Sequence, residues 1–322
     1  MAKTTKILIL CWCWVLGCGA GRSTPPQVPP PAPAPSPPAE TSVHQPTSTL
    51  PPSESRQLTY KFTLEQLERT EALEQRLSEL ERRSTSLGEQ DFGREFADLE
   101  KSFAELGYHH GTLRLLLFGI DYRRQRNSPE KALELAERAI GVCDSIGDSA
   151  GRKALMFNVA LLLEQLGRFE LAALKYEELL AAVELPSELR ATALLNLGVL
   201  RQRANAGELA RTCFHRAAIL APEHGEIQRK ALWNLLTLHY GQRQDVKALT
   251  VARTLLEHTL PSEERARVLL LCAVLEERLG NIENALATTG QALLEHMSEQ
   301  DKNAAEVYQR YLQKKREYQQ KR

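Results

Sequence analysis

One asparagine recurs at a fixed interval in the second half of the chain, and this interval constrains the fold more than any other feature of the sequence. Asn158, Asn196 and Asn234 follow one another at steps of 38 residues. A large apolar residue precedes each asparagine, and Val or Leu follows it. A fixed period between about 20 and 50 residues is the signature of a stacked repeat, in which one small unit is copied along the chain.

A loop sequence recurs as well: PSELRA at residues 186–191 returns as PSEERA at residues 261–266. Together with the asparagines, it places the starts of successive units near Lys153, Ala191, Arg229 and Ala266. We therefore predict repeats at 153–190, 191–228, 229–265 and 266–299, preceded by a degenerate unit at 113–152.

Each unit is predicted to be a pair of helices. The composition is rich in Ala, Leu, Glu and Arg, which favour helix over strand. Proline inside a helix costs about 3 kcal/mol, so prolines should mark the ends of helices. The four prolines after residue 52 all fall in or beside predicted turns: Pro129, Pro186, Pro222 and Pro261. The predicted fold class is all-α.

The small and aromatic residues of these units resemble those of tetratricopeptide repeats (TPRs). Gly167, Phe169, Ala172 and Tyr176 fall where that family carries glycine, an aromatic residue, alanine and an aromatic residue. The equivalent positions in the later units hold Gly198, Ala210, Phe214, Ala217 and Pro222, then Ala273, Gly280, Ala285 and Ala292. The resemblance implies a solenoid of helical hairpins whose first helices line a concave groove.

The resemblance also implies which side chains face that groove. The groove would have an apolar floor and a mixed rim, which suits an apolar peptide or an amphipathic helix from a protein partner. For the asparagines, a structural role in bonding neighbouring backbone competes with ligand contact, and Phe157 and Trp233 have core packing as the alternative. The predicted groove residues are Phe157, Asn158, Leu161, Leu195, Asn196, Val199, Trp233, Asn234, Thr237, Tyr240, Leu270 and Val274, with Glu164, Gln202 and Glu277 in the same row as Tyr240.

The N-terminus reads as an export signal. Lys3 and Lys6 precede an apolar run of about ten residues, shorter than the roughly 20 that a membrane-spanning helix needs. Val15-Leu16-Gly17-Cys18 resembles a bacterial lipobox, so residues 1–17 are predicted to be a lipoprotein signal peptide and Cys18 the lipidated residue. We expect an outer-membrane anchor facing the periplasm. Ordinary cleavage near Ala20, which would give a soluble periplasmic protein, is the alternative.

Three further segments flank the repeats. Residues 18–56 are Pro-rich and are predicted to form a disordered tether. Residues 57–112 are predicted to form N-terminal helices, because Leu73, Leu77 and Leu80 keep heptad spacing. These helices either cap the solenoid or form a short coiled coil, with residues 64–87 driving self-association. Residues 300–322 are predicted to form a polar C-terminal capping helix.

The sequence offers little for catalysis. GDSAG at residues 147–151 matches the G-x-S-x-G of serine hydrolases, but no strand pattern precedes Ser149, and the segment reads as a turn followed by an N-cap serine. His109 and His110 are adjacent and do not share a helix face, so no metal site is predicted. Positive and negative charges number 41 each, which lacks the basic footprint of a nucleic-acid binder.

The sequence therefore predicts a protein without enzymatic activity or cofactor. Its function would be to recruit or position a protein partner in bacterial envelope assembly through the concave groove. A self-oligomerising periplasmic scaffold is the alternative, and a hydrolase using Ser149 is a remote one. Cys143, Cys213 and Cys272 are expected to serve as small apolar helix residues.

Overall fold

The computed structural model describes residues 63–221 and 225–321, and within them it contains thirteen helices and no strand. The all-α prediction is confirmed. The helices are α2 Leu64–Arg83, α3 Glu89–Glu105, α4 His109–Gln125, α5 Pro129–Ile146, α6 Ser149–Gln165, α7 Phe169–Leu180, α8 Ser187–Arg203, α9 Gly207–Leu220, α10 Glu226–Gly241, α11 Asp245–Leu256, α12 Ser262–Arg278, α13 Ile282–Leu294 and α14 Glu299–Gln320.

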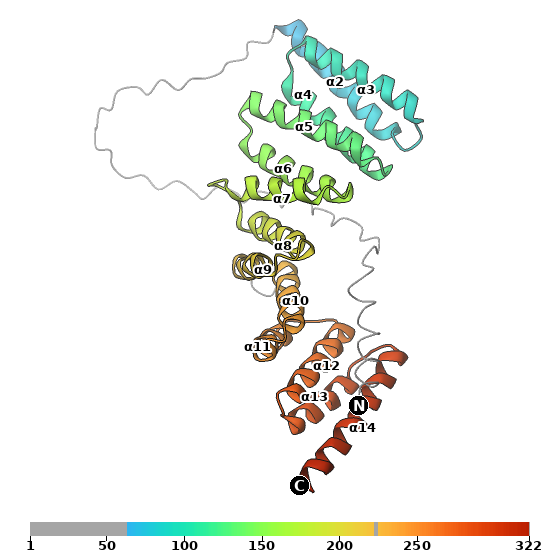
Figure 1. The fold of residues 1–322 in the computed structure, drawn as a ribbon. Helices are drawn as coiled ribbons and strands as arrows, with labels where there is room; N and C mark the ends of the chain where they lie inside the picture. Colours follow the sequence, from blue (N-terminus) through green and yellow to red (C-terminus); the bar gives the residue numbers. More distant parts are fainter. Residues whose placement is uncertain (1–62, 222–224, 322) are drawn as a thin grey trace, which may run out of the picture. The chain divides into compact units, whose positions relative to one another are not determined.

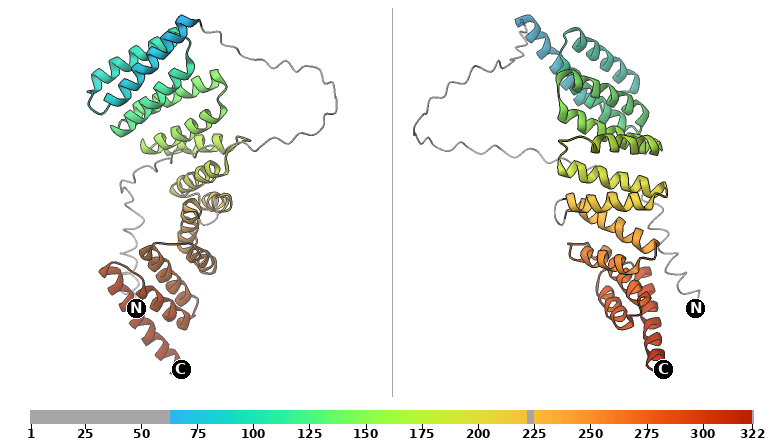
Figure 2. Two further views of the ribbon diagram at one scale, coloured as in Figure 1. Left: turned by 180° about the vertical axis from the view of Figure 1, so that it is seen from behind. Right: turned by 60° about the vertical axis from the view of Figure 1, so that its left-hand side comes forward.

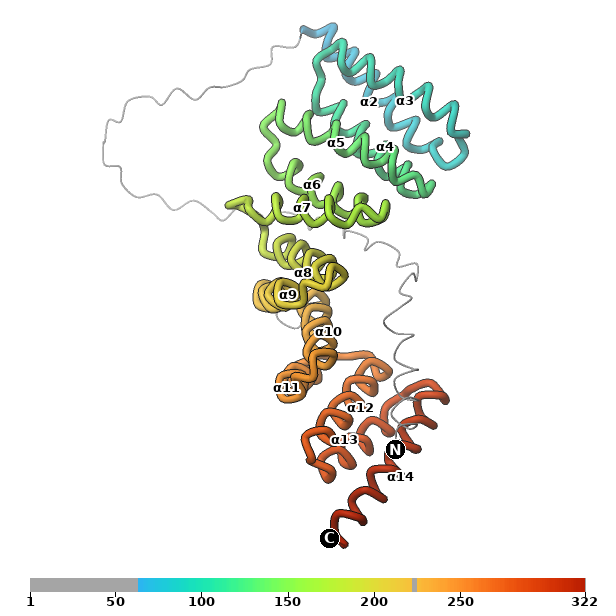
Figure 3. The backbone as a smooth tube through the Cα atoms, viewed as in Figure 1, coloured from blue at the N-terminus to red at the C-terminus, as the bar shows by residue number. Residues whose placement is uncertain are grey.

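From α4 to α13 the helices form five antiparallel hairpins, each made of a first and a second helix (Figure 1). The second helix of each hairpin packs against the first helix of the next, and α14 packs against α13 (Figure 2). The hairpins thus follow one another in chain order, as the tube in Figure 3 traces. This arrangement confirms the predicted solenoid of TPR-like hairpins.

The first helices α4, α6, α8, α10, α12 and α14 bury side chains at the same places. Both the seventh and the fourteenth residue are buried in every one of them. Fully burying a leucine contributes about 1.5–3 kcal/mol, and no hairpin can supply this burial alone. The seventh residues are Leu115, Leu155, Ala193, Leu232, Val268 and Ala305, and the fourteenth are Tyr122, Leu162, Leu200, His239, Leu275 and Leu312.

The glycine of the TPR-like pattern has a steric reason in the hairpin of α8 and α9. A Cβ atom on Gly198 would lie 2.5 Å from the ring of Phe214. That ring is fully buried. The two helices can approach this closely only because residue 198 has no side chain.

The repeated loop motif marks the start of a first helix. Pro186 and Pro261 are the N-cap residues of α8 and α12. Arg190 then donates to the carbonyl oxygens of Leu180 and Ala182, at 3.1 and 2.9 Å. Arg265 donates to Leu256 in the same way, at 3.1 Å. Both arginines satisfy carbonyls at the C-terminal end of the preceding helix, where a cation is favoured.

The helices begin three or four residues before the predicted unit starts. Those starts were Lys153, Ala191, Arg229 and Ala266, whereas α6, α8, α10 and α12 begin at Ser149, Ser187, Glu226 and Ser262. The predicted unit at 113–152 likewise begins at His109, and it is a complete hairpin rather than a fragment. A period in the sequence gives the length of a unit but not its first residue.

Every turn inside a hairpin contains one residue with a left-handed backbone. Glycine fills it at Gly167 and Gly280, with φ of 71° and 87°. Asn205 takes the same place at 58°, which accounts for the missing turn glycine in that unit. Arg243 also takes it, at 60°, although arginine gains nothing from this conformation.

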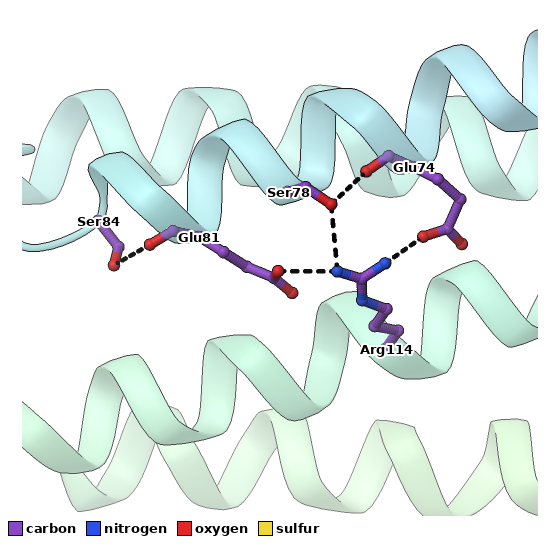
Figure 4. A network of polar contacts seen from close by, with 5 residues as sticks. All are labelled: Glu74, Ser78, Glu81, Ser84 and Arg114. Atoms are coloured by element: carbon purple, nitrogen blue, oxygen red, sulfur yellow. Dashed lines mark hydrogen bonds and ion pairs between the residues drawn. The ribbon is translucent and has the colours of Figure 1, made fainter.

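The two N-terminal helices belong to the stack. The heptad residues Leu73, Leu77 and Leu80 of α2 are buried within the chain itself. Arg114 of α4 holds α2 in place through Glu74, through Glu81 at 2.7 Å and through Ser78 at 3.3 Å (Figure 4). These three heptad leucines are therefore covered by the chain's own helices, whereas Leu64 and Leu67 of α2 are exposed.

The expected leader at 1–17, Cys18, the Pro-rich stretch at 18–56 and Pro222 lie outside the described residues. Among the helices that are described, none combines the length and the apolar character needed to cross a membrane.

Arg243→Gly should stabilise the protein by about 1 kcal/mol, since a left-handed non-glycine residue costs about 1–2 kcal/mol and glycine returns part of that in chain entropy. Urea denaturation of the full-length protein measures the change. Arg243→Ala is the control: it removes the same side chain but keeps the backbone strain, so no gain is expected. Destabilisation by the glycine would contradict the strained turn.

Candidate functional site

The residues predicted to face the groove share one register in the structure. They occupy the ninth, tenth, thirteenth and sixteenth positions of α6, α8 and α12, and positions one residue earlier in α10. We call the surface formed by these positions the first-helix face. The folding of the repeats thus brings the predicted residues onto equivalent places of successive helices.

Most of these side chains are partly exposed and so remain accessible on the face. Phe157, Leu161, Val199 and Trp233 all belong to this half-buried class. Leu195 does not: it is only 7% exposed and belongs to the buried core. Phe157 is shared between the two roles, because its ring packs edge-on against Tyr176 with centroids 5.7 Å apart.

The repeat asparagine Asn196 has a structural partner, but not the neighbouring backbone. Its side-chain amide donates to the hydroxyl of Tyr176 in the preceding hairpin, at 2.9 Å. Tyr176 in turn donates to Oε1 of Glu164, at 2.6 Å. The asparagine therefore helps to join two units and to fix the orientation of a rim carboxylate.

Burial changes the acidity of both groups in this chain of hydrogen bonds. Loss of solvent raises the pKa of Glu164, and the hydrogen bond from Tyr176 and the charge of Arg203 oppose this rise only in part. Burial also raises the pKa of Tyr176, and the neighbouring Glu164 carboxylate raises it further. The charge of Arg203 therefore offsets the loss of solvent around Glu164 only in part.

In two places a cation from the following first helix contacts the outermost residue of the face, which is the fifteenth residue of α10 and the sixteenth of α12. The guanidinium of Arg278 in α12 lies over the ring of Tyr240, 5.0 Å from its centroid. Lys315 in α14 donates to Oε1 of Glu277 at 2.6 Å. Both cations are the seventeenth residue of their helix. These pairs join successive first helices, so Tyr240 and Glu277 have a structural role on the face.

The step from α6 to α8 is built differently. Arg203, the seventeenth residue of α8, lies over the ring of Phe169 at 4.7 Å instead of pairing with Glu164. Within the part of the chain that the structure describes, no ion pair reaches Glu164. Tyr176 is its hydrogen-bond donor there.

Two more helices continue the face, which the sequence reasoning missed. The ninth residues of α4 and α14 are Leu117 and Val307, exposed by 42% and 46%, and the thirteenth residue of α14 is Tyr311, exposed by 37%. The sequence signal for these positions is the place of each residue counted from the start of its first helix. These positions fall outside the predicted groove, because the first unit is predicted to start at residue 113 and residues 300–322 are predicted to form a capping helix.

The serine of the hydrolase-like motif lies at the start of a helix. Helix α5 precedes it, and Asp148 is the N-cap, accepting from the backbone of Gly151 at 2.8 Å. Ser149 is thus the first helical residue and not the N-cap that was predicted. A nucleophile of this motif needs a strand-to-helix turn, which is not what these residues form.

The cysteines of the described helices are not joined by disulfides. Cys143 and Cys272 are buried, Cys213 is partly buried, and all three are free thiols. No group of three or more His, Cys, Asp and Glu side chains suited to a metal ion occurs among the described residues.

No protein-family model and no curated protein matches the chain. Solved structures do match it. BtubC (BKLC) from P. vanneervenii is 18% identical with a TM-score of 0.50, over 69% of this chain and 89% of that one. PilF from Pseudomonas aeruginosa is 17% identical with a TM-score of 0.47, over 70% and 91%. YrrB, described as a TPR protein with an unusual peptide-binding site, is 18% identical with a TM-score of 0.44, over 61% and 90%. At these identities the likeness is one of fold.

Glu164→Gln should stabilise the protein more at pH 7.5 than at pH 4. Because the pKa of Glu164 is raised above the ordinary value of a glutamate, the folded state binds this proton more tightly than the unfolded state. The wild type therefore loses stability as the pH rises through this range, and glutamine does not. Urea denaturation at both pH values measures the difference, with the exposed Glu170→Gln on α7 as control. An equal effect at both pH values would contradict the buried, uncompensated carboxyl group.

Proposed function

We propose that the protein is a non-catalytic scaffold whose first-helix face recruits or positions another protein. One observation carries the proposal: the repeat register places a partly exposed apolar residue on every first helix along the face. Phe157, Trp233 and Leu270 occupy one such row, and Leu161, Val199 and Val274 occupy the next. A regular row of this kind suits one extended or helical segment that crosses several hairpins.

The chemistry of the face indicates the class of partner. Apolar side chains dominate its two central rows, whereas the outer row mixes Glu164, Gln202, Tyr240 and Glu277. Two of these outer residues are already engaged by Arg278 and Lys315. An amphipathic helix or an apolar peptide is therefore the partner that the face supports best.

The proposed place of action is the bacterial cell envelope. Support comes from the N-terminal sequence: an apolar run after Lys3 and Lys6 ends in Leu16-Gly17-Cys18, which resembles a lipobox. Several acyl chains on Cys18 would anchor the protein stably, because each buried methylene contributes about 0.8 kcal/mol. The Pro-rich residues 18–56 would then hold the hairpins away from the outer membrane, on its periplasmic side. The process served would be envelope assembly.

Photo-crosslinking probes at Phe157, Leu161 and Trp233 should capture the same protein partner in cells. These side chains are partly exposed on successive positions of the face, and purification followed by mass spectrometry identifies what they capture. Matched probes at Leu171 and Leu209, which are exposed on the second helices, should not capture it. Capture from the second helices alone would place the binding surface elsewhere.

Cys18→Ser should move the protein from the membrane fraction to the soluble fraction of a bacterial host. The serine hydroxyl cannot carry the thioether-linked lipid, while the apolar leader is unchanged. Cys13→Ser is the matched control and should stay with the membrane. A Cys18→Ser protein that still sediments with the membrane would rule out the lipid anchor.

A further inference from the structure

Between α6 and α8, the outer row of the first-helix face contains the carboxylate of Glu164. Within the described ranges, no cation forms an ion pair with it. Glu164 and Glu277 are both the sixteenth residue of their helix. Oxygen Oε1 of Glu277 takes a bond from Lys315, and the hydroxyls of Tyr308 and Tyr311 donate to the same carboxylate, at 3.2 and 3.1 Å. Among the described residues, the donor to Glu164 is Tyr176 alone.

The contact at Glu277 shows what chemistry satisfies a carboxylate at this position. Tyr311 and Lys315 lie four residues apart, so they project from the same side of α14 and reach one carboxylate together. The aromatic ring supplies apolar contact and a hydroxyl, and the ammonium group supplies the charge. A partner helix with an aromatic residue followed four residues later by lysine offers the same pair of groups.

We propose that Glu164 binds a lysine ammonium group of the partner, presented by a helix with this aromatic and lysine spacing. The inference rests on the proposed function and adds the chemistry by which the partner would be recognised. Charge complementarity carries it: a half-buried carboxylate without an ion pair lies beside the apolar residues Phe157 and Leu161. An incoming cation would gain a charged hydrogen bond in surroundings that are partly shielded from water.

The surroundings of Glu164 hold its carboxylate ready for such a ligand. Tyr176 fixes Oε1 at 2.6 Å, and Asn196 fixes the tyrosine hydroxyl at 2.9 Å, so the carboxylate does not have to be ordered on binding. The raised pKa of Glu164, caused first by burial, agrees with a carboxyl group that lacks its cation. A bound ammonium group would lower that pKa again.

Arg203 has the same position in α8 that Arg278 has in α12 and Lys315 in α14, but it contacts a different group. Its guanidinium lies over the ring of Phe169, 4.7 Å from the centroid. Arg278 and Lys315, its equivalents in the later units, instead contact the outer row. Because Arg203 packs on Phe169, it does not form an ion pair with Glu164.

A synthetic peptide with the sequence of residues 304–318 tests the proposal, because it contains Val307, Tyr311 and Lys315. Fluorescence anisotropy of the labelled peptide with the full-length protein gives the affinity. Glu164→Gln should weaken binding about tenfold, the loss expected for one hydrogen bond to a charged group. The Lys315→Gln peptide should lose the same factor on the wild-type protein and nothing further on the Glu164→Gln variant.

Matched variants separate this contact from general charge effects. Glu170→Gln on α7 should leave the affinity unchanged, as should the Lys314→Gln peptide. Arg203→Ala should not weaken binding. Equal affinity for wild type and Glu164→Gln, or no binding at millimolar peptide, would overturn the proposal.

The outcomes also distinguish this inference from the proposed function. If crosslinks at Phe157 and Trp233 capture a partner but Glu164→Gln does not weaken the peptide, the face binds proteins without the lysine contact. If no partner is captured at the face while the peptide shows the expected pattern, the lysine site is real but the wider face is not the binding surface.

Discussion

The structure depends on apolar side chains that a single hairpin cannot bury. In each first helix the seventh and fourteenth residues are buried in the stack, as Leu162 and Leu200 illustrate. Stability in such a stack is close to a sum over units and over their contacts with nearest neighbours. The end helices α2 and α14 belong to the same stack, since they bury Leu77 and Leu312 against their neighbours.

Much of this architecture could be predicted from the sequence, because the fold requires particular residue types at fixed positions of each repeat. The equal spacing of Asn158, Asn196 and Asn234 reflects hairpins of equal length, and PSELRA recurs because Pro186 and Arg190 begin a helix and bind the carbonyls of the previous one. The starting residue of each unit was not predictable in this way. That residue is set by the hydrogen bonds at the helix ends. The predicted groove therefore includes four first helices, whereas the face extends over six.

The site was harder to predict than the fold, because exposure depends on packing that no spacing reveals. Leu195 has the same register as Phe157, yet it is buried. For Asn196, bonding to neighbouring backbone and contact with a ligand were both open, and its amide bonds Tyr176, a residue that no other unit has at that position. This partner lies on another helix, and the residue types around Asn196 do not indicate it. The left-handed backbone of Arg243 likewise could not be predicted, because arginine does not favour that conformation.

The cations of the outer row make the copies unequal. Arg278 suits the ring of Tyr240, and Lys315 suits the carboxylate of Glu277, so α12 and α14 each carry a cation matched to the preceding first helix. If α12 and α14 exchanged places, each cation would meet the partner that suits the other. These two contacts thus favour the present order of the units and would oppose shuffling of the array after duplication.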